Sequence, residues 1–237
     1  MTEAVSRASA ASVLHGVPLP AAIAARPRDE RGYPALAITP WEDGQPRFAA
    51  TGTARTFVCA AERRCSVCGT PMPPGPVWRV VSGTEADAIA AACDAGRPYL
   101  NRAATQEAPG HRACMLFAAI VCPYLARPNA RRGAPSHVPG LNAERGARRG
   151  LGGAVVGFDE YESAYQGGRV LFRFAGLREF LRHEYGAEHL PALTEAVAAE
   201  AITQSAATLP CPGYLLADEA AAERRFAELL RDSRSVL

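Results

Sequence analysis

Two short motifs in this sequence combine residue types that bind soft metal ions. The first, RRCSVCGTPM at residues 63–72, places Cys65 and Cys68 in a C-x2-C spacing with a glycine directly after the second cysteine. The second, PGHRAC, places His111 and Cys114 three residues apart at the start of an apolar stretch that predicts a helix, so both side chains lie on one helix face. Zinc favours thiolate and imidazole ligands at tetrahedral corners. The two motifs together predict a zinc site of three cysteines and one histidine.

The donor set also indicates what the metal does. A catalytic zinc usually keeps one position open for water or substrate, whereas three cysteines and one histidine close the coordination shell. The alternative of a redox dithiol at Cys65 and Cys68 is disfavoured, because four prolines follow where such a motif normally starts a helix. Iron or an iron-sulfur cluster is a second alternative, and it would have to recruit Cys122 or Cys59. The prediction is a structural zinc.

The remaining cysteines show no paired spacing. Cys122 follows Cys114 by eight residues, which is about 12 Å along a straight helix, too far to share one ion. Cys59, Cys93 and Cys211 are isolated in the sequence, and burial as small apolar side chains is the expectation for each.

Composition restricts the function classes. All 26 basic residues are arginine, and against 24 acidic residues they leave a net charge of +2, too small to indicate polyanion binding by itself. The longest apolar run, residues 113–122, is far shorter than the roughly 20 residues that cross a bilayer. The N-terminal stretch is interrupted by prolines and lacks the pattern of a signal peptide. We therefore expect a cytoplasmic protein with no membrane segment.

Hydrophobic periodicity and turn residues predict the secondary structure. Short strands are expected at 35–39, 56–60 and 77–81, helices at 84–95 and 111–122, and a hairpin of 154–158 with 169–174. Helical patterns begin near Leu177, Leu190 and Ala222. The expected fold class is α+β, with a treble-clef-like zinc module inside a single-core domain, a β-rich N-terminal half and a mostly helical C-terminal third.

We divide the chain into four segments on this pattern. Residues 1–26 are expected to form a frayed N-terminal segment, and 27–126 the α+β region with the zinc module. Residues 127–150 hold six arginines among glycines and prolines without apolar periodicity, which predicts a loop. Residues 151–237 are expected to add the hairpin and further helices to the same core.

Several stretches resemble a known family in the order in which they occur: PRDERGYP, EDGQPRF, RRCSVCG, NRAATQEAPGHRAC and CPYLARP. They are similar to P-x-D-x-x-G-x-P, D-G-x-P-x-F, C-W-V-C-G, N-R-x-x-x-x-x-P-x-H-x-x-C and C-P-F-L in a family of uncharacterised proteins of actinobacteria and their phages. The resemblance covers residues 27–128. This chain departs from the pattern with Ser66 in place of the tryptophan and with an extra piece around residues 83–96.

The resemblance implies a metal role for Cys65, Cys68, His111 and Cys114, and it singles out Cys122 with Pro123. It also marks motif positions in the first stretch, namely Pro27, Asp29, Gly32 and Pro34. It implies no activity.

Other residues are candidates for ligand binding. The stretch PRDERGYP could hold an anionic ligand, because the guanidinium fork of an arginine binds carboxylate or phosphate. The alternative is a solvated turn with a surface ion pair. The candidate residues are Arg28, Asp29, Arg31 and Tyr33. Arg131 and Arg132 of the arginine loop could contact phosphates. His183 and His189 are expected at the surface, and Glu160 and Glu162 in solvent.

Three functions follow from these features. The first is a cytoplasmic zinc-binding protein whose structural site supports a surface for a small anionic ligand or a protein partner. The alternative is an enzyme acting on a small anionic metabolite, with the zinc module as scaffold. The third is nucleic-acid binding through the arginine loop.

Overall fold

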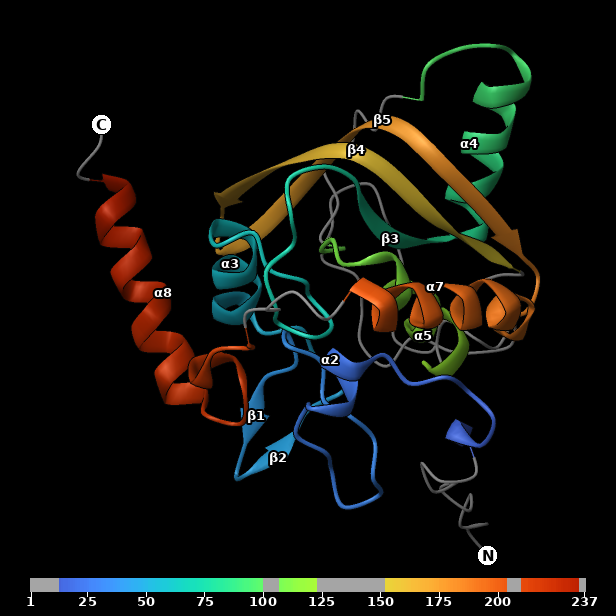
Figure 1. Cartoon of the computed structure of the whole chain (residues 1–237). Helices are drawn as coiled ribbons and strands as arrows, with labels where there is room; N and C mark the ends of the chain where they lie inside the picture. Colours follow the sequence, from blue (N-terminus) through green and yellow to red (C-terminus); the bar gives the residue numbers. More distant parts are fainter. Residues whose placement is uncertain (1–12, 100–106, 123–151, 204–209, 235–237) are drawn as a thin grey trace, which may run out of the picture.

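A computed structural model of the chain describes residues 13–99, 107–122, 152–203 and 210–234 (Figure 1). It is a mixed α+β structure built around a three-stranded antiparallel sheet in the order β3-β4-β5. The strands are β3 (Val77–Ser82), β4 (Gly153–Gln166) and β5 (Arg169–His183). The α+β class is confirmed. The division into a β-rich N-terminal half and a mostly helical C-terminal third is not, because the two longest strands lie at 153–183.

Helices cover both faces of this sheet. The helices α4 (Gly83–Asp94) and α5 (Arg112–Val121) each pack against β3 and β4, and Val80 and Val81, which point to opposite faces, are both buried. In Figure 1 the long β4-β5 hairpin arches over α5 and over α7 (Leu190–Thr203), which packs on α5. The short 3-10 helix η1 (Gly186–His189) joins β5 to α7.

The long hairpin extends the predicted one in both directions. The predicted pairing of 154–158 with 169–174 lies within β4 and β5, but residues 177–181 continue β5 instead of starting a helix. Leu181 pairs with Val155 and Phe180 with Val156 of the central strand. The helix prediction was wrong because pairing along β4 places these apolar residues against the core in an extended conformation, whatever their local spacing.

A second correction concerns α3 (Thr53–Ala61), which lies where a strand was expected at 56–60. The helix buries Ala54 and Val58 on one face, four residues apart, and the Thr56 hydroxyl donates to the Gly52 carbonyl. Burial at helical spacing therefore outweighs the strand preference of the threonine and valine side chains. The predicted strand at 35–39 is also absent: these residues form no strand, and the isolated bridge between Arg28 and Pro34 lies just before them.

The N-terminal elements are short. The helix α2 (Ala21–Ala24) buries Ile23 in the main core, and β1 (Trp41–Glu42) pairs with β2 (Gln45–Pro46). Asp43 and Gly44, both with positive φ, form the two-residue turn between these strands, as expected for an Asp-Gly hairpin.

A small satellite core joins the C-terminal helix α8 (Glu219–Arg234) to α3. Its buried members are Ala37, Val58, Cys59 and Leu215. The guanidinium of Arg55, fully buried, donates to the Glu219 carboxylate and to main-chain carbonyls, including that of Leu215. The 3-10 helix η2 (Gly213–Leu215) completes the contact, and α8 stands at the side of the molecule in Figure 1.

Among the described helices, none is long and apolar enough to cross a membrane. Residues 1–12 and the whole arginine loop of 127–150, with Arg131 and Arg132, lie outside the described residues, and the four-segment division stays a prediction.

Candidate metal centre

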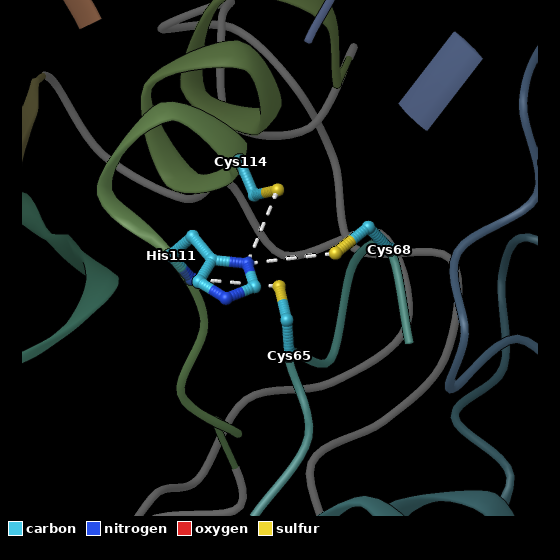
Figure 2. A group of neighbouring side chains, drawn as sticks. All are labelled: Cys65, Cys68, His111 and Cys114. Carbon is cyan, nitrogen blue, oxygen red and sulfur yellow. Dashed lines mark hydrogen bonds between the residues drawn. The ribbon is translucent and has the colours of Figure 1, made fainter. Parts of the chain in front are cut away.

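The four predicted ligands come together at one point (Figure 2). The ligand atoms of Cys65, Cys68, His111 and Cys114 all lie within 4.8 Å of one another. The three cysteines are almost completely buried, with exposed fractions of 0 to 1%. Such a group of three thiols and one imidazole can hold a metal ion, and its three sulfurs are shielded from solvent while His111 is half-buried.

The first pair of ligands is presented by a tight turn between α3 and β3. The Cys65 N–H donates to the Thr70 carbonyl at 2.9 Å, and the Gly69 N–H donates back to the Cys65 carbonyl at 2.8 Å. Gly69 has φ of +79°, and a Cβ at this position would lie 2.6 Å from the Cys211 sulfur. Glycine after the second cysteine is therefore required both by the backbone conformation and by the close approach of Cys211.

The second pair sits at the start of α5. His111 is the N-cap residue and Cys114 lies three residues on, so both project from the first turn toward the cysteine turn. The His111 N–H lies 3.4 Å from the Cys65 sulfur and donates to it. The positive end of the helix dipole also favours thiolates here. A Cβ on Gly110 would lie 2.8 Å from the Cys65 sulfur, so a glycine is needed before His111 as well.

The orientation of the His111 ring is set by a main-chain carbonyl. Its Nε2 lies 3.1 Å from the Pro71 carbonyl oxygen, which can only accept, so Nε2 carries the proton. Nδ1 then faces the thiols, 3.5 Å from the Cys68 sulfur and 3.9 Å from the Cys114 sulfur. A carbonyl on the far nitrogen is the usual partner of a metal-binding imidazole, because it fixes the tautomer and aims the lone pair.

Electrostatics inside the cluster favour bound positive charge. Burial raises the pKa of Cys65, but hydrogen bonds with Cys114 and Cys68, together with the His111 charge, lower it well below its ordinary value. Burial lowers the pKa of His111, yet hydrogen bonds and charge interactions with Cys65 and Cys68 outweigh burial and raise it to about 11. In the absence of metal, the cluster therefore retains a proton on the imidazole to balance thiolate charge. A metal cation takes over that balancing role when it binds.

The first turn of α5 is tied to the sheet by a polar network. Arg112 donates to both carboxylate oxygens of Glu179, at 2.7 to 3.0 Å, and the indole N–H of Trp78 donates to the same carboxylate at 2.7 Å. The main chains of Trp78 and Gly110 exchange two hydrogen bonds of 2.9 Å. These contacts position the helix that carries His111 and Cys114 relative to β3.

The predicted ligand-binding turn at residues 28–33 is held by hydrogen bonds between its own residues. The Asp29 carboxylate, 6% exposed, accepts from the Arg31 guanidinium at 2.7 Å and from the main-chain N–H groups of Arg31 and Tyr33. Arg28 donates to the Gly32 carbonyl, and the Arg31 guanidinium lies over the Tyr33 ring at 5.2 Å. Arg28, Asp29 and Arg31 are thus engaged within the turn, and ligand binding at this turn stays a prediction.

The other cysteines stay out of the metal group, as predicted, but not all are buried. Cys59 is buried in α3, whereas Cys93 on α4 is exposed, contrary to expectation. Cys122, at the C-terminal end of α5, and Cys211 are half-buried. The Cys211 sulfur accepts from the guanidinium of Arg26, a buried residue, at 3.1 Å.

Two buried histidines were not found by sequence reasoning. His183 and His189 are only 2% and 4% exposed, so the expectation of surface histidines was wrong. They contact each other across the turn from β5 into η1, and no spacing rule in the sequence signals such a pair. Glu160 and Glu162 are exposed on the hairpin, as expected.

A comparison of the chain with models of known protein families, with curated proteins and with solved structures found no match.

Proposed function

We propose that this chain is a zinc-binding protein in which the metal holds two separate parts of the fold together. The observation that carries the proposal is the closed cluster, in which His111 Nδ1 and three buried sulfurs surround one point. Three thiolates and an imidazole are a donor set that zinc favours in structural sites. The His111 orientation supports metal binding over a chance gathering of thiols, because Nδ1 already faces the sulfurs and offers its lone pair once a metal displaces the proton.

The proposed role is structural because of where the ligands come from. One pair belongs to the turn before β3 and the other to the first turn of α5, more than 40 residues later. A single ion would therefore crosslink the chain across a long loop and fix α5 on the sheet. The complete burial of the sulfurs speaks against a substrate reaching the metal.

The order of elements around the cluster supports a treble-clef arrangement. A cysteine turn comes first, followed by an antiparallel bridge between Trp78 and Gly110, and then by the helix that supplies the second pair. We propose membership of the actinobacterial and phage family on the motifs given above. We also propose that the protein acts in the cytoplasm, where its free thiols stay reduced. The centre would then support a surface for a small anionic ligand or a protein partner.

Metal content tests the proposal directly. Untagged protein, purified without added metal, is analysed by elemental mass spectrometry and visible absorption, beside the variants Cys68→Ser and Cys93→Ser. We expect one zinc per chain and no visible absorption in the wild type. Cys68→Ser should lose most of the zinc, because it removes a ligand sulfur. Cys93→Ser is the matched control, since Cys93 is exposed on α4, and it should keep the full zinc content.

Two results would contradict the proposal. Absence of metal from the wild type, together with failure to take up zinc or cobalt in titration, would leave the cluster as buried thiols. Iron with visible absorption would replace zinc by an iron centre and would bring the remaining cysteines into consideration.

A further inference from the structure

The buried pair of His183 and His189 has a geometry that depends on protonation. Nε2 of His189 lies 2.7 Å from Nδ1 of His183, and the two rings meet edge to face with centroids 4.6 Å apart. A hydrogen bond between two imidazoles needs one N–H and one lone pair. If both rings carry two protons, two N–H groups face each other and the bond is lost. The pair is therefore compatible with at most one positive charge.

The charged neighbours offer little compensation for an added proton. Glu179 of β5 and Arg112 of α5 act on His189, and Glu188 of η1 acts on both rings. The Glu179 carboxylate already accepts from Arg112, and Glu188 accepts from the main-chain N–H groups of Glu184 and Tyr185. Arg112 repels a second cation. A proton added to this buried pair is thus poorly balanced.

The pair lies at the junction between β5 and η1, directly before the helix α7 that packs on α5. His183 is the last residue of β5, and His189 ends η1 directly before α7 begins at Leu190. Helix α7 packs on α5, and its Leu193 is fully buried in the main core. Glu200 of α7 lies close enough to interact electrostatically with His111 and Cys65. Docking of α7 therefore covers the helix that presents half of the ligands.

We propose that the His183–His189 pair is an acid-sensitive latch that holds α7 on α5, so that protonation at mildly acidic pH releases α7 and exposes the metal centre. The latch itself depends only on the imidazole pair and on α7. Its consequence for the metal rests on the proposed function.

The sign of the effect follows from linkage. Burial lowers the pKa of His189 below its ordinary value of 6.5. In the pH range below that value, the released state binds the proton more readily than the docked state, so docking is lost as pH falls. The full contribution of His189 to docking of α7 is therefore present above about pH 6.5.

Hydrogen exchange measured by mass spectrometry on the metal-loaded full chain tests the latch. Exchange of α7 peptides is compared at pH 7.5 and 5.5 after correction for intrinsic rates. The variant His189→Gln keeps an amide near the position of Nε2 but does not titrate. His15→Gln is the matched control, because His15 is exposed and outside the pair. We expect α7 to exchange up to about tenfold faster at pH 5.5 in the wild type and in the control, the limit for uptake of one proton by a group of ordinary pKa 6.5.

In His189→Gln the same change in pH should alter corrected α7 exchange less than about threefold. Equal pH dependence in the wild type and in this variant would overturn the latch, as would a wild type without pH dependence in α7. If His189→Gln does not fold, His183→Asn replaces it, and the wild-type pH series by itself decides whether α7 is released. Metal content of the wild type at pH 7.5 separates the two proposals: a chain without metal fails the proposed function, whereas bound metal with pH-independent α7 exchange fails the latch.

Discussion

The cysteine-histidine cluster and the turn at residues 28–33 are both candidate sites in the sequence, but their polar groups are bonded in different ways in the structure. In the turn, the Asp29 carboxylate accepts three hydrogen bonds from donors of the turn itself. In the cluster, His111 Nδ1 and three sulfurs converge on one point, and the Pro71 carbonyl accepts from the far nitrogen of the ring. Polar residues that satisfy one another build structure, whereas ligands that converge with lone pairs facing inward favour a cation.

Removal of the proposed metal should destabilise the chain more than any change in the turn at residues 28–33. Incubation with a strong chelator is expected to lower the melting temperature by at least about 10 °C, because metal-binding free energy in such sites is folding free energy. Circular dichroism follows the transition, and added zinc should restore it. An unchanged melting curve after verified metal loss would show that α5 docks without the ion.

Loss of the Glu179 carboxylate should cause the next largest loss of stability. Glu179→Ala removes the partner of Arg112 and Trp78, which should cost about 2–3 kcal/mol of unfolding free energy in urea. Hydrogen bonding to Arg112 lowers the pKa of Glu179 below its ordinary value of 4.5, so this contribution is present above about pH 4.5 and fades as pH falls through the folded value. The difference between wild type and variant should therefore shrink at pH 3. A constant difference down to that pH would argue against the ionised pair.

A smaller effect is expected from the Asp29 carboxylate. Asp29→Ala removes three hydrogen bonds within the turn and should cost about 1–2 kcal/mol of unfolding free energy, with metal content unchanged. Asp29→Asn, which keeps an acceptor for the two main-chain N–H groups, should lose less. If neither change affects stability, the turn is not held by this carboxylate and its role in ligand binding should be reconsidered.

The smallest effect should come from Arg31. Its pair with Asp29 is partly exposed, with the Arg31 side chain 35% accessible, and exposed pairs contribute about 0–1 kcal/mol. Arg31→Ala is therefore expected to change the urea midpoint only slightly, and less so in 0.5 M salt. A loss above about 2 kcal/mol would indicate that stacking on Tyr33 matters more than the ion pair.

The metal ligands could be predicted from the sequence because their signals are local. A C-x2-C turn with glycine after it and an H-x2-C at a helix start each arrange two ligands by backbone geometry alone, and the structure brings the two pairs together. The predicted secondary structure was wrong where the local preference of the residues and their burial disagreed. Residues 56–60 contain strand-favouring side chains, yet α3 forms because Ala54 and Val58 bury one helical face.

Tertiary contacts alone decided the remaining features. Residues 177–181 have a spacing that suits a helix, and only their pairing with β4 makes them strand. The buried Arg55 depends on Glu219, a neighbour distant in sequence, and the histidine pair depends on the burial of both rings in the folded chain. The sequence by itself determined which side chains can bind a metal, since that depends on residue type and short spacing. The folded chain decided which polar groups are satisfied and which converge, because burial and partners are properties of packing.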